Sequence, residues 1–131
     1  MSTTRLIAIF LLIFGCFNAS AIAAERFTAM SANNEGVGPI ASGATPEEAR
    51  AKATAACRRV SNSCSSGAAV APSPDGFFVA VCCNNPKRGC VVAAEPTREA
   101  AEKVARQSLQ ENGYSVCQRF GTYSTGDGKP R

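Results

Sequence analysis

The sequence contains no histidine and no tryptophan. Without histidine, the chain lacks the most common general base, the Ser-His and Cys-His nucleophile pairs, and the usual ligand of catalytic zinc. Without tryptophan and with few other aromatic residues, its core must be built mainly from valine and alanine. Small side chains each bury little apolar area, so we expect covalent cross-links to add stability.

The sequence also lacks an apolar run long enough to span a membrane. Its longest early run, Leu6 to Phe14, has nine residues, whereas a bilayer core needs about 20. This run follows Arg5 and precedes the small residues of Ala21-Ile22-Ala23, an order typical of a secretory signal peptide. We therefore expect residues 1–23 to be a signal peptide and the mature chain to be periplasmic or secreted, without a membrane span.

Cys16 offers an alternative within the same leader. Residues 13–16 read Ile-Phe-Gly-Cys, which resembles a bacterial lipoprotein cleavage box. Acylation of Cys16 would tether the domain to a membrane through a lipid anchor instead of releasing it.

Long blocks of one charge are missing from the remaining 108 residues. The whole chain carries a net charge of +4, which falls to +3 without Arg5, and basic and acidic residues are interleaved. This pattern indicates a mixed solvated surface and argues against a nucleic-acid partner, which would require a basic stripe.

The mature chain is unusually rich in cysteine. Six cysteines remain after cleavage, which in an exported domain of this size indicates three disulfides. Fifteen pairings are open to six cysteines, and a strained bond between two adjacent ones is among them. The loop 84–89 is bracketed by two cysteines, and another two lie at a helix end and at the start of the next strand. The predicted pairs are Cys57–Cys64, Cys83–Cys90 and Cys82–Cys117.

An internal repeat organises the chain, which aligns with itself when shifted by 51 residues. Each copy predicts two strands joined by an Asn-containing turn, a helix capped by threonine, and a third strand. The matched residues include Phe27 with Phe78, Asn33-Asn34 with Asn84-Asn85, Glu48-Ala49 with Glu99-Ala100, and, after two extra residues, Cys64 with Cys117.

The predicted elements have definite bounds in both copies. The first copy has strands at 27–32 and 37–42, a helix from the N-cap Thr45 to about residue 59, and a strand at 65–71. The second has strands at 77–83 and 89–94, a helix from the N-cap Thr97 to Gly113, and a strand at 114–123.

This order predicts an α+β fold built from two strand-strand-helix-strand repeats. We expect one disulfide-stabilised domain over residues 24–123, with a mostly antiparallel sheet that carries both helices on one face. Residues 124–131 have no apolar anchor, so they are predicted to be a disordered tail.

The chain resembles, over most of residues 27–117, a known family of small exported bacterial domains of unknown function. The resemblance rests on the helix Thr45 to Ala53 leading to Ala56-Cys57, on Cys64, and on the strand Gly67 to Ala71. The family repeats a unit of strands, an Ala-rich helix that ends at cysteine, and a cysteine-bearing strand. The present chain lacks the family's frequent Trp and Tyr strand residues and adds Cys82-Cys83. No catalytic residues are established for this family, so none can be assigned by resemblance.

The tip of the second hairpin carries the strongest candidate binding residues: Asn84, Asn85, Lys87 and Arg88. A disulfide across the base of this loop would hold the tip rigid and lower the ordering cost of binding. The alternative is that the tip only keeps the protein soluble.

These features favour an exported, non-catalytic binding module whose partner is another envelope or secreted protein. By analogy with other small exported bacterial domains, it would act as an inhibitor or immunity protein. A carboxylate-dependent envelope enzyme is the alternative, with Asp75, Glu95 and Glu111 near turns or element ends, and a structural envelope component is a third hypothesis. No cofactor or metal is predicted, because the cysteines do not form a C-x2-C pair.

Overall fold

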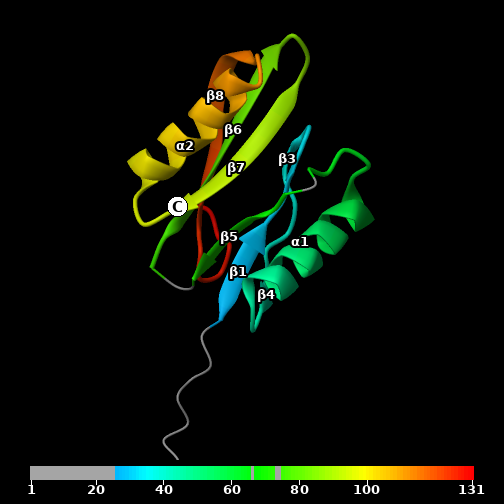
Figure 1. Cartoon of the computed structure of the whole chain (residues 1–131), viewed down its shortest axis with the longest axis vertical. Helices are drawn as coiled ribbons and strands as arrows, with labels where there is room; N and C mark the ends of the chain where they lie inside the picture. The colour runs from blue at the N-terminus through cyan, green and yellow to red at the C-terminus, as the bar shows by residue number, and fades with distance from the viewer. Residues whose placement is uncertain (1–25, 66, 73–74) are drawn as a thin grey trace, which may run out of the picture.

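The computed structural model describes residues 26–65, 67–72 and 75–131 as an α+β fold (Figure 1). The predicted signal peptide 1–23 and Cys16 lie outside these residues. None of the described helices is long and apolar enough to cross a membrane. The elements are β1 (Phe27–Met30), β2 (Ala32–Asn33), β3 (Gly36–Val37), β4 (Ala41–Gly43), α1 (Pro46–Val60), β5 (Ala69–Pro72), β6 (Phe77–Asn85), β7 (Gly89–Glu95), α2 (Arg98–Glu111) and β8 (Ser115–Ser124).

The strands form three antiparallel sheets in the described chain instead of the single sheet that we expected. Two of them have three strands, in the orders β4-β1-β5 and β7-β6-β8, and β2 pairs with β3 in a short hairpin. In both three-stranded sheets the strand that comes first in the sequence lies in the centre.

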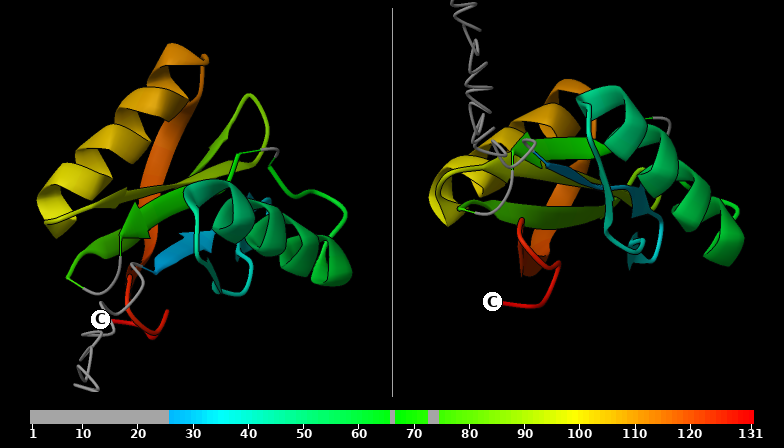
Figure 2. Two further views of the ribbon diagram at one scale, coloured as in Figure 1. Left: turned by 60° about the horizontal axis from the view of Figure 1, so that its bottom comes forward. Right: turned by 90° about the horizontal axis from the view of Figure 1, so that it is seen from below.

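The two helices pack on different sheets, so the prediction that both cover one face of a single sheet was wrong (Figure 2). Helix α1 packs on the sheet β4-β1-β5, and α2 packs on the sheet β7-β6-β8. The other faces of the two sheets meet in a central cluster. Its buried members are Met30, Ala32, Ala71, Phe78, Ala80 and Val92.

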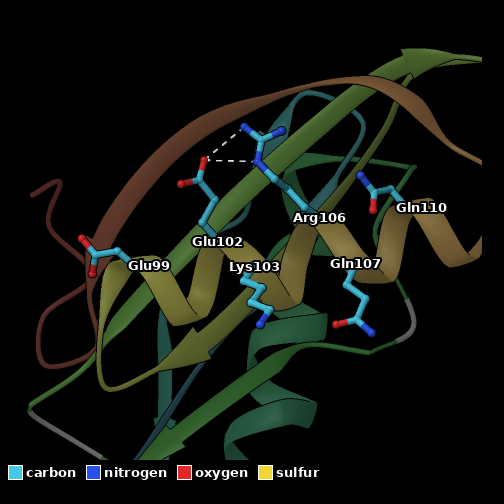
Figure 3. A pocket seen from close by; sticks show the side chains of 6 residues that line it. All are labelled: Glu99, Glu102, Lys103, Arg106, Gln107 and Gln110. Atoms are coloured by element: carbon cyan, nitrogen blue, oxygen red, sulfur yellow. Dashed lines mark hydrogen bonds and ion pairs between the residues drawn. The ribbon is translucent and has the colours of Figure 1, made fainter.

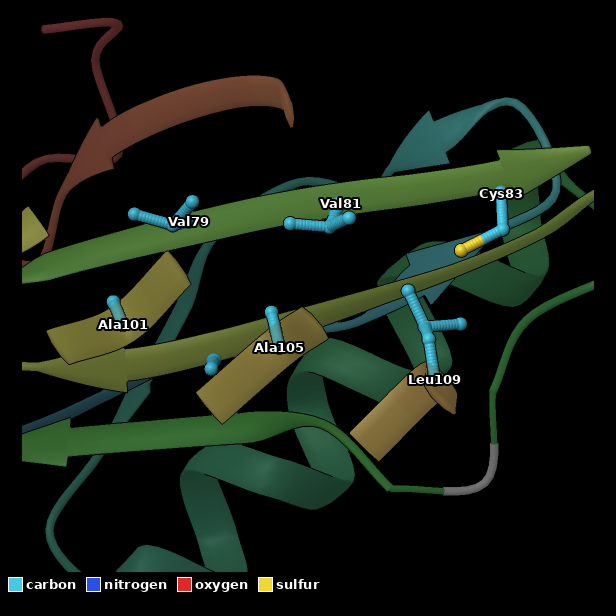
Figure 4. Packing of buried hydrophobic residues seen from close by; sticks show 7 residues of the cluster. Val79, Val81, Cys83, Ala101, Ala105 and Leu109 are labelled. Atoms are coloured by element: carbon cyan, nitrogen blue, oxygen red, sulfur yellow. The ribbon is translucent and has the colours of Figure 1, made fainter. Parts of the chain in front are cut away.

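Strand β6 explains this layering, because it is apolar on both faces. Phe78 and Ala80 face the central cluster, whereas Val79, Val81 and Cys83 face α2. All five side chains are fully buried. The second set packs on the small-residue stripe of α2, shown in Figure 4 with Ala101, Ala105 and Leu109. A strand buried on both faces must lie in an inner layer, with its own helix outside.

Both helices begin where local capping chemistry predicts. The side chain of Thr45 accepts a hydrogen bond from the backbone N–H of Glu48 at 3.1 Å, and Thr97 accepts one from Ala100 at 3.2 Å. These bonds satisfy N–H groups that the first turn of a helix leaves without an intrahelical partner. At the other end of α2, Gly113 adopts a positive φ of 83°, as the predicted helix stop requires.

The first hairpin is broken into β1, β2, β3 and β4, whereas two continuous strands were predicted. Ser31 interrupts it on one side, and its carbonyl accepts a hydrogen bond from the backbone N–H of Gly38 at 2.8 Å. Gly38 lies so close to α1 that an added Cβ would be 2.9 Å from the Cβ of Cys57. The chain therefore bends, and the tip that contains β2 and β3 reaches the second sheet.

The expected disordered tail at 124–131 is instead folded back onto the sheet. Thr125 is fully buried; its carbonyl accepts a bond from the Thr28 hydroxyl, and its own hydroxyl accepts one from the backbone N–H of Gly76. Arg131 N–H then donates to the carbonyl of Thr122 at 2.8 Å. These polar contacts, not an apolar anchor, hold the segment against both halves of the molecule.

Candidate binding surface at the second hairpin

Three disulfides cross-link the described chain, and two of them lie at the base of the second hairpin. Cys57–Cys64 joins the end of α1 to the following loop, as predicted. The other two bonds are Cys82–Cys90, between β6 and β7, and Cys83–Cys117, between β6 and β8. Strand β6 is thus bonded covalently to both of its neighbours just before the tip.

The predicted pairs Cys83–Cys90 and Cys82–Cys117 were therefore wrong, because Cys82 and Cys83 each bond to the partner predicted for the other. We treated Gly89 as part of the loop, but the structure places it in the ladder opposite Cys83. Cys90 then lies opposite Cys82. A shift of one residue in register moves a side chain to the other face of a sheet, which is why the exchange is complete.

The hairpin tip, residues 84–88, is exposed but tied to its surroundings by polar contacts. Arg88 donates from Nε to the carbonyl of Asn34 at 2.6 Å and from its terminal nitrogen to Oδ1 of Asn84 at 3.1 Å. Asn85 donates from Nδ2 to the hydroxyl of Ser115 at 2.8 Å. The tip is therefore joined to the first hairpin and to the start of β8.

These contacts divide the four predicted binding residues into two groups. The guanidinium of Arg88 and the amide groups of Asn84 and Asn85 are engaged within the molecule. Lys87 is exposed and makes no hydrogen bond or ion pair within the described residues. The structure thus leaves Lys87 as the charged group at the tip that a partner could reach without breaking an internal contact.

A pocket of about 300 Å³ lies beside the tip, and sequence reasoning did not identify it. Its floor is the start of β7, residues 89–91, and its walls come from both halves of the chain. One wall carries Ser63 and Ser65, and the other carries Asn112 and Tyr114. No charged side chain of the described residues lines it. Nothing in the sequence could have placed these segments together, because they are joined only through the packing of the two sheets.

Two of the predicted carboxylates, Asp75 and Glu95, line a second pocket of about 430 Å³. It opens between Val70 and Ala71 of β5 and the far end of β7. Glu111, the third candidate, is not among its lining residues. Within the described chain, no group of three Asp, Glu, Cys or His side chains is placed to hold a metal ion.

The outer face of α2 bounds a hollow of about 850 Å³, but its chemistry is that of a solvated surface (Figure 3). All of its lining side chains are charged or carry amides, and they come from α2 alone. Glu102 and Arg106 form an ion pair of 3.1 Å there. Arg106 also donates to the carbonyl of Cys117 at 3.3 Å, so this face connects α2 to β8.

Perturbed ionisable groups lie away from the tip. The hydrogen bond from Lys52, with that from the Ala44 N–H, lowers the pKa of Glu48 at the start of α1. A backbone hydrogen bond from Lys129 lowers the pKa of Asp127. Burial raises the pKa of Tyr123. These shifts have structural causes at a helix start, a turn and the core, and none marks a catalytic group.

No protein-family model, curated protein or solved structure matches the chain. The resemblance to small exported repeat domains therefore stays a prediction.

Proposed function

We propose that this chain is an exported, non-catalytic binding module that presents the hairpin tip, residues 84–88, to another envelope or secreted protein. The observation that carries the proposal is that the tip is both exposed and clamped covalently at its base. The disulfides at Cys82 and Cys83 fix the base of the tip, and Arg88 ties it to the first hairpin. A surface that is ordered before binding loses little conformational entropy on binding, which favours affinity.

The chemistry of the tip favours an acidic patch on the partner. Lys87 supplies a solvent-exposed cation, and the polar groups around it can form rim hydrogen bonds. Complementary charge raises the association rate and suppresses wrong partners. An inhibitor or immunity protein of the envelope would use the tip in this way.

Two further parts of the proposal concern architecture and compartment. We propose that the fold consists of two copies of one strand-strand-helix-strand unit, because β4-β1-β5 and β7-β6-β8 share the same order of strands. Three disulfides support export to an oxidising compartment. The intact mass of the mature protein would separate cleavage after residue 23 from lipidation at Cys16.

Affinity capture from envelope extract tests the binding function. The wild-type chain, a Lys87→Glu variant and a Lys103→Glu control should be immobilised in parallel. Lys103 lies on the outer face of α2, so its variant matches the change in charge away from the tip. We expect one protein to be retained by wild type and control, and to bind Lys87→Glu about tenfold more weakly. Equal retention by all three baits would overturn the role of the tip.

A carboxylate-dependent enzyme acting on envelope polymers is a second candidate, favoured by the pocket that contains both Asp75 and Glu95. A pair of carboxyl groups across a cleft is the arrangement that glycoside hydrolysis uses. Release of reducing ends from purified envelope polysaccharide, abolished by Asp75→Asn with Glu95→Gln, would support this candidate. Equal release by the wild-type and the double variant would remove it.

A further inference from the structure

The two outer strands of the sheet β7-β6-β8 present unpaired backbone edges, and the disulfides show which groups point outward. In an antiparallel ladder, opposite residues about 4.5 Å apart at Cα do not exchange hydrogen bonds, whereas hydrogen-bonded pairs are about 5.5 Å apart. The Cα atoms of Cys82 and Cys90 are 4.1 Å apart, and those of Cys83 and Cys117 are 3.9 Å apart. Both pairs are therefore of the non-hydrogen-bonded kind.

It follows that the N–H and C=O of Cys90 point away from β6, toward the free edge of β7. By the same argument, those of Cys117 point toward the free edge of β8. The observed hydrogen bonds on β8 agree with this assignment. The carbonyl of Cys117 accepts a bond from Arg106. The carbonyl of Thr122, which the same alternation also places outward, accepts one from the backbone N–H of Arg131.

The edges of β7 and β8 differ in how they are protected from pairing with a strand of another chain. The edge of β8 is covered in part by Arg106 and by the C-terminal segment. It also carries a shift in register opposite Ala80 and Val81, and a positive φ of 58° at Val116. Bulges and charged side chains on an edge discourage pairing with another chain.

From Gly89 to Ala94 the edge of β7 has neither a bulge nor a charged side chain, and β2 and β5 are strands that lie near it. The same stretch contains no proline. Outside the ladder with β6, no hydrogen bond from within the described chain reaches the backbone of Cys90. These groups open into the 300 Å³ pocket, whose floor is residues 89–91.

The shape and charge of this pocket define what it can hold. Asn34, Ser63 and Ser65 stand on one side of the strand, and Ser108, Asn112 and Tyr114 stand on the other. A single extended chain placed along the edge of β7 would contact both of these walls. Because no charged side chain lines the pocket, an ionised peptide side chain would lose its hydration there without gaining a partner.

We propose that the edge of β7 at Cys90 binds an extended, uncharged segment of a partner protein by strand addition. The segment donates to the carbonyl of Cys90 and accepts from its N–H, and its side chains contact the serine and asparagine walls. Asn34 lines the pocket and also binds Arg88, so this site is continuous with the hairpin tip. The inference rests on the proposed binding function and names the part of the partner that enters the groove.

A phage-displayed library of random peptides tests this assignment without knowledge of the partner. The library is selected on the full mature chain, and the enriched peptide is then measured against two variants. Ser108→Trp fills the pocket from the wall of α2, and it removes no side-chain hydrogen bond, since the one bond recorded at this residue uses its carbonyl. Gln107→Trp places the same side chain on the neighbouring, exposed position of α2 as the control.

We expect peptides with uncharged central residues that bind wild type and Gln107→Trp alike. Ser108→Trp should bind about tenfold or more weakly, because two main-chain hydrogen bonds are lost. The bound peptide should also slow hydrogen exchange at the Cys90 amide, and methylation of alternate peptide amides should abolish both effects. The assignment would be overturned if no peptide were enriched, or if the enriched peptide bound Ser108→Trp and Gln107→Trp equally. It would also be overturned if raising the protein concentration alone slowed hydrogen exchange at the Cys90 amide.

The same variants separate this inference from the proposed function. If a captured partner is lost with Lys87→Glu but retained by Ser108→Trp, the tip binds and the strand edge does not. If library peptides depend on Ser108 but no extract protein depends on Lys87, the edge site stands and the role of the tip fails.

Discussion

Removing the two disulfides of the second hairpin one at a time should have unequal effects on stability. The bond Cys83–Cys117 spans 34 residues, and Cys82–Cys90 spans 8. The chain-entropy relation gives about 3.8 kcal/mol for the first and about 2.5 kcal/mol for the second. Each pair joins a buried cysteine to a half-buried one, so the loss of packing is similar and largely cancels in the comparison.

Paired alanine variants, Cys83→Ala with Cys117→Ala and Cys82→Ala with Cys90→Ala, make this measurable. Chemical unfolding followed by circular dichroism should show that the first variant is less stable by about 1.3 kcal/mol, close to a tenfold difference in the unfolding equilibrium. A thiol assay under denaturing conditions should find no free thiol in either variant.

The thiol assay is also the sharper test of the pairing itself. If the partners were exchanged, each double substitution would break two bonds and leave two reactive thiols per molecule. Reactive thiols in either variant, or a greater loss of stability on removing Cys82–Cys90, would refute the reasoning.

Four further predictions concern packing, capping and pH. Phe78→Ala should cost about 3–5 kcal/mol in unfolding experiments, because the ring is fully buried between the sheets, whereas Val104→Ala at a 44% exposed position should cost under about 0.5 kcal/mol. Thr45→Ala should lower stability by about 1 kcal/mol through loss of the cap, measured in the same way. The pKa of Glu48 is lowered on folding, so the stability difference from Glu48→Gln should be largest at neutral pH and shrink as the pH falls below 4.5 through the lowered pKa. The raised pKa of Tyr123 has the opposite sense, so stability should fall as the pH rises above 10.0 through the raised pKa, and Tyr123→Phe should remove this decline.

The predictions from sequence that succeeded concern interactions within a few residues. Thr45 and Thr97 cap their helices, and Cys57 bonds to Cys64 seven positions later. Glu48 and Lys52, four positions apart on α1, form an ion pair at 2.8 Å. Each of these depends on local spacing that the sequence displays directly.

The layer arrangement does leave a signal in the sequence. Residues 77–83 are an almost continuous apolar run, and such a run indicates a strand buried on both faces. A single sheet with both helices on one side would have left one face of this strand in water. The second face of this strand must therefore be buried against another layer. Met30 of β1 and Ala71 of β5 form that layer, which gives a core between two sheets.

Other features could not be predicted, because they join segments that only the tertiary fold brings together. The bond from Arg88 to Asn34 spans 54 residues and that from Thr28 to Thr125 spans 97. Neither leaves a pattern in the sequence. The pocket beside β7 has the same origin, since its walls come from opposite halves of the chain.

The central claim is that the clamped tip, residues 84–88, is the surface that meets a partner. Hydrogen exchange of the chain, alone and saturated with the captured partner protein, tests this most directly. We predict that the amides of the tip exchange more slowly in the complex, while those of the outer face of α2 around Lys103 keep their rates. Protection that falls on α2 and leaves the tip unchanged would contradict the claim.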